Sequence, residues 1–514
     1  MSALAGAVRE WRDVVGDSHV STDPSVLAAM GTTTYATEQA VTAVVHPGSR
    51  DEVRECLRIA ARHHVPVYPV STGKNWGYGS TVPPRDGCAL LGLGRLNRIV
   101  DFDEDLAYVT VEPGVTQADL HAFLRSRRSR LRPSVTGSSP DSSLVGNVVE
   151  RGLGEGLYGD RFSHVCGMEV VIPTGEVLRM GFTRYAGART GPLHRWGVGP
   201  WLDGLFTQSN LGVVTRMTLW LAPRARNFLS FRFAAAETDL GALADAVREL
   251  RLAGVLGSGF VIANDVRALS GHQQYPRDLC GNQTPLPESA RRKLREHWGL
   301  SAWNGEGSLH AVDAAHGRAL REVVSRFLGP HTESLSFEAG ERDTIQCGVP
   351  VEDHLAMAYW RKPAPRPERD LDPDRDRCGL IWITPVVPMT GRDVVAAVAT
   401  IERTSTEFGF EPNIGLNLVS ERTATVTTAL VYDRDEPGQD DRARACHRRM
   451  SSQLVAQGYP PYRYTAHSAP ELTATDDSAS VIARLKSAVD PIGVLAPGRY
   501  ELLSPNEYAS HPTR

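Results

Sequence analysis

A strand–helix–strand order that runs directly into a glycine-rich loop constrains the fold of this chain more than any other feature. Residues 41–47 predict a strand, and Ser49 followed by Glu52 forms a capping box that opens a helix. Residues 65–70 predict a second strand, which leads straight into the loop STGKNWGYGS at 71–80. Because ligands commonly bind at strand ends in such arrangements, the loop is a candidate binding site.

A second glycine-rich segment, GNVVERGLGEG at 146–156, follows about seventy residues later. The first loop is neither a Walker loop nor the GxGxxG turn that opens a Rossmann helix. Its glycines nevertheless allow a close approach of the backbone, and successive N–H groups in such turns cradle phosphates. Two loops of this kind could enclose a long dinucleotide from both sides, whereas the first loop alone could equally be a plain tight turn.

The predicted pattern of strands and helices changes after Pro223. Before it, apolar runs at 107–114, 168–175 and 212–221 predict further strands. After it, residues 230–254 predict a strand followed by a helix, and longer helices then alternate with strands to about residue 460. The aperiodic stretch 361–377, rich in Pro, Arg and Asp, predicts an exposed loop, and 480–490 predicts a helix that stops at Pro491.

Composition excludes several classes of protein. With 514 residues, 56 Lys plus Arg, 60 Asp plus Glu and a net charge of −4, the chain lacks the basic excess of a nucleic-acid-binding protein. No stretch approaches the roughly 18 apolar residues of a membrane span, and the N-terminus does not resemble a secretory signal. We therefore expect a cytoplasmic enzyme. The seven cysteines form no CxxC pair, so we expect reduced thiols, with no disulfide scaffold and no metal site.

Eight motifs occur in the order seen in one flavoprotein family: STGKNWGYG (71–79), VEPGVT (111–116), SLVGNVVERG (143–152), YGDRF (158–162), GMEVVIPTGE (167–176), DGLFTQSNLGVVTRMTLWL (203–221), YRY (462–464) and DPIGVLAPGR (490–499). From about residue 40 to residue 500 the chain resembles the vanillyl-alcohol oxidase and p-cresol methylhydroxylase flavoproteins. The resemblance implies a two-domain α+β fold of the PCMH type. Its FAD-binding domain would comprise residues 1–222 and 471–514, and a cap domain at 223–470 would be inserted between them. Length alone suggested about three units.

The resemblance also implies how noncovalently bound FAD would be held. The residues placed at the cofactor are Ser71, Thr72, Gly73, Lys74, Asn75, Gly79, Ser138, Gly146, Asn147, Gly152, Val214 and Arg499. The two loops would hold the pyrophosphate through backbone N–H groups. Arg499 matches a basic residue near the flavin N1–C2=O edge, where a cation stabilises the charge that grows on hydride uptake. The alternative is that Arg499 is a surface residue, since only four of the 56 Lys and Arg residues are lysines.

Members of this family oxidise a para-substituted phenol at its benzylic carbon, through a p-quinone methide. Tyr78, Tyr462 and Arg463 match the residues that bind the phenolate oxygen, although the two tyrosines could instead be packing residues. Glu150 matches an acidic residue beside flavin N5, where a carboxylate could accept a proton or activate water. Its alternative role is to pair with Arg151.

The sequence departs from the family at two places. The histidine to which some relatives tether flavin falls on Thr425 or Val426, and the tethering tyrosine falls on Ala358, so we expect no covalent link. A slip of one residue would make Tyr359 the tether. In the second glycine segment, Glu155, Leu157 and Arg161 replace residues that flank the pocket in relatives. These changes predict a substrate larger than cresol or vanillyl alcohol.

Three functions remain open at this point. The first is an oxidase that passes electrons from a phenol, or a related benzylic alcohol or amine, to O2. The second is a dehydrogenase that uses a cytochrome or another carrier. The third is a non-redox flavoprotein transferase or a ligand-binding relative, which the retention of Tyr78, Tyr462 and Arg463 disfavours. The resemblance also implies a homo-oligomer.

Overall fold

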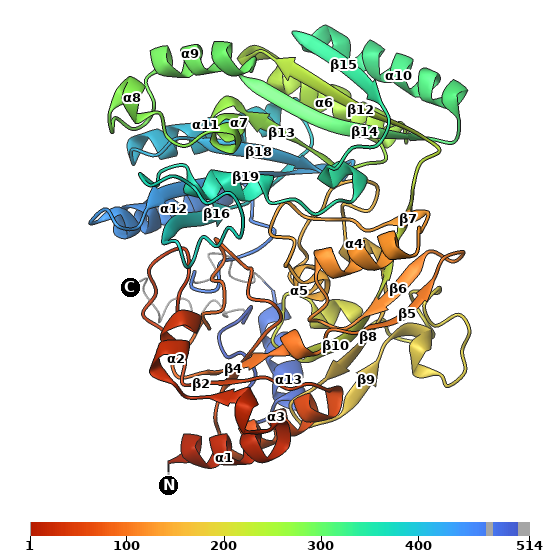
Figure 1. Ribbon diagram of the computed structural model, residues 1–514, viewed down its shortest axis with the longest axis vertical. Coiled ribbons are helices and arrows are strands. Elements are labelled where there is room, and N and C mark those ends of the chain that lie inside the picture. The colour runs from red at the N-terminus through yellow and green to blue at the C-terminus, as the bar shows by residue number, and fades with distance from the viewer. Residues whose placement is uncertain (1, 469–475, 502–514) are drawn as a thin grey trace.

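The structure is a computed structural model that describes residues 2–468 and 476–501. Two halves lie one above the other (Figure 1). The N-terminal elements form the lower half, and one large sheet with its helices forms the upper half. Both halves mix helices with sheets, as expected for an α+β chain.

The first sheet contains the strands that flank the glycine loop. Its order is β1 (Val20–Ser21), β2 (Ala43–Val45), β4 (Ala89–Gly92) and β3 (Val67–Val70), with β2 and β3 parallel to β4 and β1 antiparallel to β2. Helices α1 (Ala3–Val15), α2 (Pro24–Met30) and α3 (Arg50–His63) accompany it. The predicted strands and helix are confirmed. The N-cap of α3 is also confirmed, since Ser49 Oγ accepts from Glu52 N at 3.2 Å, but the Glu52 carboxylate accepts from Gly48 N instead of closing the box on Ser49.

The second sheet is antiparallel and carries the strands predicted at 107–114, 168–175 and 212–221. Its order is β5 (Ile99–Asp103), β6 (Tyr108–Val111), β10 (Val213–Trp220), β8 (Val165–Val171) and β9 (Val177–Arg179). Helices α4 (Gln117–Ser126) and α5 (Leu144–Val149) bury their apolar side chains in the same core as this sheet. A short ladder of β7 (Leu131–Arg132) and β11 (Ala222–Pro223) lies where the chain leaves the lower half (Figure 1).

The upper half is built on an antiparallel sheet of eight strands. Its order is β15 (Ser334–Ala339), β12 (Asn227–Ala235), β14 (Trp303–Ala311), β13 (Phe260–Asn264), β18 (Asn413–Leu418), β19 (Thr423–Asp433) and β16 (Cys378–Ile383), and β17 (Val386–Pro388) pairs with β19. Its helices are α6 (Leu240–Leu252), α7 (Asp265–His272), α8 (Arg277–Cys280), α9 (Glu288–Trp298), α10 (Ala314–Leu328), α11 (Gly391–Glu407) and α12 (Gln439–Ala456). Short 3₁₀ segments lie at Asp17–His19, Leu93–Arg95, Phe162–His164, Gly181–Arg184, Asp203–Phe206, Glu237–Asp239, Gly329–His331, Ile345–Cys347 and Asp353–Tyr359.

The two faces of this large sheet differ in chemistry because side chains alternate along each strand. One face carries apolar residues such as Phe231, Ile262 and Leu416, and helices α6, α10, α11 and α12 pack over it. On the other face, alternate positions such as Ala263 and Asn417 line an internal cavity. One face of the sheet therefore packs against helices, and the opposite face lines the cavity.

The C-terminal segment returns to the lower half, where α13 (Ser478–Val489) lies among the N-terminal elements (Figure 1). This helix confirms the one predicted at 480–490. The chain beyond it joins β3, because Val67 N donates to Val494 O and Ala496 N donates to Val67 O, both at 2.8 Å. Asp490 fixes the turn between them, since its buried carboxylate accepts from the backbone N–H groups of residues 493–495 and from Lys486 Nζ.

The residue limits of the two domains stay a prediction. We retain a division at residues 222 and 470 as a proposal, guided by the change from the second sheet to the large sheet between β10 and β12. Residues 469–475 and 502–514, which fall at the end of the cap segment and within the C-terminal segment, lie outside the described residues.

The stretch 361–377 contains no helix or strand, as predicted, but it is not simply exposed. Lys74 Nζ lies 3.1 Å from Asp372 Oδ2, and Ser80 Oγ donates to Asp374 Oδ1 at 2.9 Å. Leu371, which directly precedes Asp372, is buried. The aspartates that suggested a solvated loop therefore anchor it to the glycine loop.

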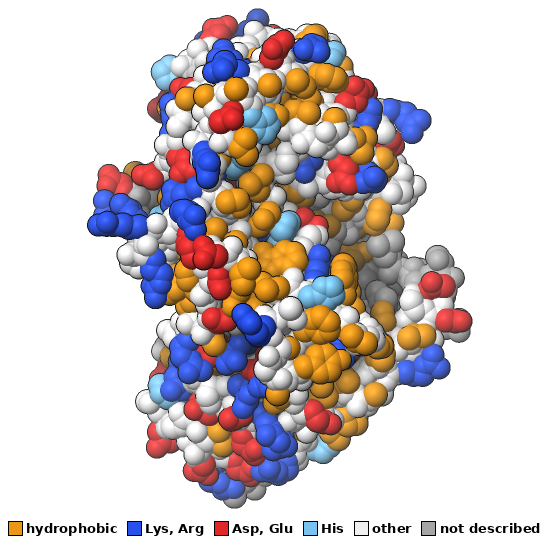
Figure 2. Space-filling view, turned by 90° about the vertical axis from the view of Figure 1, so that its right-hand side faces the viewer, with side chains coloured by type: hydrophobic (Ala, Val, Ile, Leu, Met, Phe, Trp, Pro, Cys, Tyr) orange, Lys and Arg blue, Asp and Glu red, His pale blue; other side chains and the backbone are white. Residues whose placement is uncertain are grey.

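Neither a disulfide nor a helix long and apolar enough to cross a membrane occurs in the part of the chain that the structure describes. Six of the seven free cysteines are buried. Exposed apolar side chains include Tyr185, Trp196 and Val198 in the connection between β9 and β10. Figure 2 views the side on which this connection projects, and hydrophobic side chains gather across the middle of that face.

We predict that Asp490→Ala destabilises the protein. The change leaves the buried N–H groups of Val494 and Leu495 without their carboxylate acceptor, at a cost of about 1–3 kcal/mol for each group that finds no replacement. The thermal unfolding midpoint of the flavin-loaded protein should fall by about 2 °C or more. Asp441→Ala, at a side chain that is 80% exposed, is the control. Equal midpoints for the two variants would contradict the assigned role of Asp490.

Candidate active site

A cavity of about 1110 Å³ lies between the glycine loops of the lower half and the inner face of the large sheet. Most of the residues expected to bind cofactor or substrate line it: Ser71, Thr72, Gly73, Lys74, Asn75, Tyr78, Ser138, Gly146, Asn147, Glu150, Gly152, Val214, Tyr462, Arg463 and Arg499. These residues come from separate segments spread along the chain from Ser71 to Arg499. The tertiary fold therefore brings the predicted set together around one space.

The two glycine segments form a cradle. Ser143 N donates to Thr72 Oγ1 at 3.1 Å, which ties the start of α5 to the first loop. A Cβ at Gly146 would lie 2.3 Å from Ser71 Oγ, so the segments meet only because this residue has no side chain. Within the described residues, the backbone N–H groups of Thr72 and Gly73 have no protein acceptor. Such a concave set of free donors suits a diphosphate.

The cradle also contains an orphaned buried acceptor. Asn147 Oδ1 is buried and has no hydrogen-bond partner among the described residues. A Cβ at Gly152 would lie 2.3 Å from Asn147 Nδ2, so the glycine makes room for this amide. Because buried polar atoms are rarely left unpaired in native proteins, the amide is suited to a bound group with polar ring atoms. The residues present therefore fit FAD.

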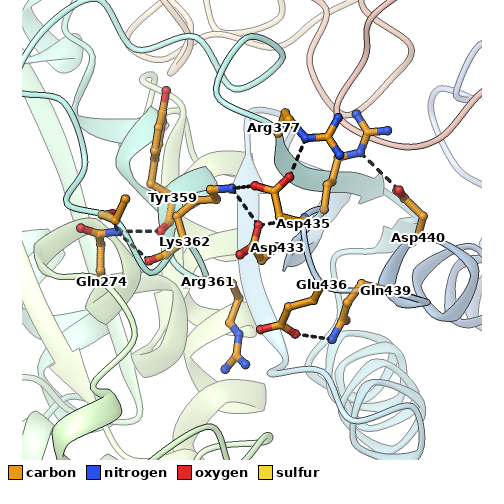
Figure 3. Close-up of polar contacts among 12 residues, drawn as sticks. Gln274, Tyr359, Arg361, Lys362, Arg377, Asp433, Asp435, Glu436, Gln439 and Asp440 are labelled. Atoms are coloured by element: carbon orange, nitrogen blue, oxygen red, sulfur yellow. Dashed lines mark hydrogen bonds and ion pairs between the residues drawn. The ribbon is translucent and has the colours of Figure 1, made fainter.

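Two predicted positions do not line the cavity. Gly79 has φ of +120°, and a Cβ there would lie 2.6 Å from the Cβ of Ala466, so this glycine serves chain packing. Tyr359 is buried elsewhere, and its hydroxyl donates to Asp376 Oδ2 at 2.6 Å. Its ring extends away from the Lys362 ion pairs in Figure 3. The preceding residue, Ala358, does line the cavity.

The segment around Tyr359 is held firmly in that orientation. Gln274 Nε2 donates to the carbonyl oxygens of Tyr359 and Lys362, at 3.3 and 2.9 Å. Lys362 Nζ lies 2.8 Å from Asp433 Oδ1 and 2.6 Å from Asp435 Oδ2 (Figure 3). These contacts anchor the 3₁₀ segment that ends at Tyr359 to the end of β19. Turning the Tyr359 side chain toward the cavity would break the hydrogen bond from its hydroxyl to Asp376.

Glu150 lies at the centre of a charged cluster. Its Oε2 accepts from Arg499 Nη2 at 2.7 Å, from Arg463 Nη2 at 3.2 Å and from the Tyr500 hydroxyl at 2.6 Å. Its Oε1 has no hydrogen-bond partner within the described residues. Burial by itself raises the pKa of Glu150, but the charges of Arg499 and Arg463 and the hydrogen bonds lower it to about 2. The carboxylate is therefore anionic throughout the working pH range.

The suggested pairing of Glu150 with Arg151 is wrong. Arg151 Nε donates to Thr207 Oγ1 at 3.0 Å, away from the carboxylate. The surface alternative for Arg499 is also wrong, because Arg499 is only 4% exposed. Ala496, Gly498 and Tyr500 have positive φ, so the APGRY turn is an unusual backbone conformation that directs Arg499 inward.

Tyr78, Tyr462 and Arg463 meet at one end of the cavity. The Arg463 guanidinium lies over the Tyr78 ring, with Cζ 3.9 Å from its centroid, and Arg463 Nη2 donates to Asn75 Oδ1 at 2.6 Å. Thr384 joins the two tyrosine segments, since it accepts from the Tyr78 hydroxyl at 3.4 Å and from Tyr462 N at 3.1 Å. Burial and the neighbouring Tyr462 raise the pKa of Tyr78 well above its usual value, so its hydroxyl stays protonated and can donate.

Sequence reasoning missed the role of Gln208. Its Nε2 donates to the carbonyl oxygens of Tyr462 at 2.8 Å and of Glu150 at 3.2 Å. Its φ is +45°, unusual for a residue other than glycine. The residue lies in the DGLFTQSN motif, so the sequence signal was present, but only the fold shows that Gln208 joins the Tyr462 segment to the Glu150 segment.

Glu155 and Arg267 are two of the further ionisable residues that line the cavity. Burial raises the pKa of Glu155 to about 8, although Gln346 Nε2 donates a hydrogen bond to its carboxylate. Burial lowers the pKa of Arg267 to about 10, which leaves it cationic at neutral pH. Glu155 was visible in the sequence as a departure from relatives. Arg267 lies in no motif, and nothing distinguished it from the other arginines.

Comparisons with known proteins agree with this geometry. A family profile of an FAD binding domain matches residues 41–181. The chain is 46% identical to 1'-carboxy-chondrochloren decarboxylase of Chondromyces crocatus, over 97% of both chains. It is 28% identical to the 4-cresol dehydrogenase [hydroxylating] flavoprotein subunit of Pseudomonas putida, over 96% of this chain and 94% of that subunit. Among solved structures, p-cresol methylhydroxylase with substrate bound matches with a TM-score of 0.88 at 26% identity, over 97% of both chains.

A fourth relative, 4-ethylphenol oxidase from Gulosibacter chungangensis in complex with isoeugenol, matches with a TM-score of 0.89 at 25% identity over 98% of both chains. These matches confirm the two-domain α+β fold and define the protein as an FAD-dependent enzyme. The chain belongs to the vanillyl-alcohol oxidase and p-cresol methylhydroxylase family.

We predict that Glu155 makes stability depend on pH. Its pKa of about 8 lies above its usual 4.5, so between these values the unfolded chain releases a proton that the folded chain keeps. The free energy of unfolding should therefore fall as the pH rises, by at most ~1.4 kcal/mol per pH unit in that interval. Glu155→Gln removes this dependence.

The thermal midpoint of Glu155→Gln, relative to that of the unmodified protein, should consequently increase from pH 5 to pH 8. Glu322→Gln, at a side chain that is 78% exposed, serves as the matched control. A constant difference between Glu155→Gln and the unmodified protein across that range would show that Glu155 does not retain its proton on folding.

Proposed function

We propose that this enzyme removes a hydride from the benzylic carbon of a para-substituted phenol. The observation that carries the proposal is the meeting of Tyr78, Tyr462 and Arg463 beside Glu150 and Arg499. Two hydroxyl groups and a guanidinium are suitable donors for one anionic oxygen. Phenols have a pKa near ~10, so these donors would favour the phenolate at neutral pH.

The phenolate is required because its electrons must replace those that leave with the hydride. As the benzylic C–H bond breaks, electron density moves from the oxygen through the ring to the benzylic carbon, which gives a p-quinone methide. Tyr78 would remain a neutral donor throughout, because burial and Tyr462 keep its pKa high. Arg463 would stay charged, since Glu150 holds its guanidinium. The group therefore binds the phenolate without exchanging protons with it.

The opposite side of the cavity suits the cofactor. FAD supplies the hydride acceptor when it is bound. Residues Ser71–Asn75 and Ser138–Asn147 would hold its diphosphate through backbone N–H groups, and Asn147 Oδ1 would pair with a polar atom of the ring system. Arg499 has a buried Nε without an acceptor in the described chain, which suits a developing negative charge.

The fate of the quinone methide separates two candidate reactions. Addition of water needs a base, and a carboxylate with a pKa of about 2 is a weak one. Loss of a side-chain carboxylate as CO2 needs no base. The relative at 46% identity is named a decarboxylase, which further favours this route over the hydroxylation named for the cresol relative. We therefore propose an oxidative decarboxylation and keep oxidation without loss of carbon as the second candidate.

Several finer properties belong to the same proposal. FAD is bound without a covalent link, supported by the placement of Tyr359 outside the cavity lining and of Ala358 within it. The electron acceptor is O2, with a cytochrome or another carrier as the alternative, and release of hydrogen peroxide under air would distinguish them. The substrate is a small phenolic molecule, and the enzyme is a cytoplasmic homo-oligomer. A flavin that no phenol reduces would instead support a non-redox function.

Tyr462→Phe should slow anaerobic flavin reduction by para-alkylphenols by about tenfold to a hundredfold. A hydrogen bond to a charged oxygen contributes about 1.5–3 kcal/mol, and here it is strongest when the phenolate donates its electrons. Stopped-flow bleaching of the flavin absorbance measures the rate. Tyr185→Phe, at an exposed tyrosine, is the matched control. Equal rates for both variants would exclude Tyr462 from phenolate binding.

Acid precipitation of the flavin-loaded protein should leave the flavin in the supernatant and a colourless pellet. A covalent bond would survive denaturation, whereas hydrogen bonds from the glycine loops would not. The measurement is flavin fluorescence in both fractions. A fluorescent pellet that becomes colourless in Tyr359→Phe would show that Tyr359 reaches the flavin and that our placement of it is wrong.

A further inference from the structure

One cation in the cavity has no anionic partner. The lysines and arginines that line the cavity are Lys74, Arg232, Arg267, Arg463 and Arg499. Four of them lie within 4 Å of a carboxylate: Lys74 of Asp372, Arg232 of Glu306, and both Arg463 and Arg499 of Glu150. Arg267 has no such neighbour within the described residues. An uncompensated cation away from bulk water is costly, so its retention calls for an explanation.

The fold holds Arg267 in place on a short helix. Helix α7 follows directly from β13, and Asn264 caps it by accepting from Arg267 N at 3.0 Å. Arg267 Nη1 donates to Asn413 Oδ1 at 3.2 Å. No other donor of this guanidinium has an acceptor in residues 2–468 and 476–501. Several N–H groups therefore remain available to a ligand.

The inner face of the large sheet leaves space for this guanidinium. A Cβ at Gly415 would lie 3.2 Å from Arg267 Nε, which is closer than ordinary van der Waals contact. A side chain at position 415 would thus crowd the guanidinium. The available space and the hydrogen bond that Arg267 donates to Asn413 both direct Arg267 along the wall of the cavity.

Trp382 connects Arg267 to the phenol-binding end. The Arg267 guanidinium lies over the indole, with Cζ 5.2 Å from the ring centroid. Trp382 Nε1 donates to Trp76 O at 3.2 Å, and a Cβ at Gly77 would lie 2.2 Å from Trp382 Cδ1. The indole therefore packs directly against the residue that precedes Tyr78. A cation and a phenolate-binding group thus lie on the two sides of one aromatic side chain.

The charges of Glu155 and Arg267 act on each other, but no ion pair within 4 Å joins the two side chains in the described part of the chain. Burial raises the pKa of the Glu155 carboxyl group to about 8, so it is mostly protonated at neutral pH. A protonated carboxyl group is a hydrogen-bond donor. Gln346 Nε2 donates to one oxygen of the Glu155 carboxyl group and so fixes its orientation. The cavity wall near Arg267 therefore offers donors and positive charge, which is the environment that a carboxylate requires.

We propose that Arg267 binds a carboxylate on the side chain of the phenolic substrate. The ligand class is a para-hydroxyphenyl alkanoic acid, with its phenol oxygen at Tyr78, Tyr462 and Arg463 and its carboxylate at the Arg267 guanidinium. This inference rests on the proposed function and adds the residue that selects acids over neutral phenols. Arg267 is a binding residue: an ion pair stabilises the carboxylate before it is lost, so its contribution is to affinity and orientation.

The chemistry balances with bound FAD as the two-electron oxidant. Loss of the benzylic hydride gives a neutral quinone methide that still carries the carboxylate on the next carbon. The bond from that carbon to the carboxylate then breaks, and its electron pair forms the side-chain double bond. The ring becomes a phenolate again, and CO2 leaves. A carboxylate held at Arg267 is thereby kept apart from the hydride acceptor while the C–H bond breaks.

The binding test uses a pair of probes that cannot lose a benzylic hydride. Calorimetric titration of the flavin-loaded enzyme with 4-hydroxycinnamate and with 4-hydroxycinnamamide compares an acid with a neutral ligand of the same shape. The acid should bind about tenfold more tightly or better, as expected for a charge-assisted pair away from bulk water. In Arg267→Gln this preference should disappear, and in Arg267→Lys part of it should remain.

Arg232→Gln is the matched control, because Arg232 lines the same cavity but already pairs with Glu306 at 2.9 Å. It should keep the preference for the acid. Equal affinities of the unmodified enzyme for acid and amide would overturn the inference, and so would an equal loss of preference in both variants. The first comparison, of acid and amide on the unmodified enzyme, needs no variant. It can therefore overturn the inference even if Arg267→Gln does not fold.

Product analysis separates this inference from the proposed function. With 3-(4-hydroxyphenyl)propanoate under anaerobic conditions, the enzyme should release one CO2 and one 4-vinylphenol for each flavin reduced. If 4-ethylphenol bleaches the flavin but the acid is no better a ligand or keeps its carboxylate, the inference fails and phenol oxidation stands. If neither compound bleaches the flavin, the proposed function itself fails.

Discussion

A single carboxylate oxygen holds three remote segments of this chain together. Oε2 of Glu150 accepts hydrogen bonds from Arg463, near the end of the cap segment, and from Arg499 and Tyr500 in the C-terminal turn. Each guanidinium is largely removed from water, so separating either one from the carboxylate would leave an uncompensated charge. The arrangement of Arg463 beside Tyr78, the inward placement of Arg499 and the attachment of the C-terminal turn thus depend on the same cluster.

The large sheet supplies the other half of the site because its faces have different partners. Apolar side chains on its outer face are covered by four helices, which fixes the sheet as a rigid wall. The inner face carries small and polar residues and leaves room for a ligand. Helix α7 lies against this inner face through its contacts with β13, β14 and β18. Arg267 reaches the cavity from that helix, so in the proposed function the large sheet and its helices would contribute substrate selection and the glycine loops would hold the cofactor.

Much of the site was predictable because cofactor binding imposes local sequence patterns. Continuous sequence motifs supply much of the cavity lining. They include the glycines at 73 and 146, the VERG segment and the APGR turn. Gly79 and Tyr359 show the limit of this reasoning. In a 3₁₀ segment successive side chains point about 120° apart. An alignment that is wrong by one residue therefore replaces Ala358, which lines the cavity, with Tyr359, whose hydroxyl binds Asp376. An alignment by sequence alone does not fix that register.

The sequence by itself determined the family, the strand and loop order around the glycine segments, and the set of residues that we propose as the phenolate-binding group. These features are local, or they recur in fixed order along the chain. Only the tertiary structure decided which charges meet. It paired Glu150 with Arg463 and Arg499 instead of Arg151. It also left Arg267 lining the cavity with no carboxylate within 4 Å among the described residues. Electrostatic partners are set by distances between segments far apart in sequence, and those distances exist only once the chain has folded.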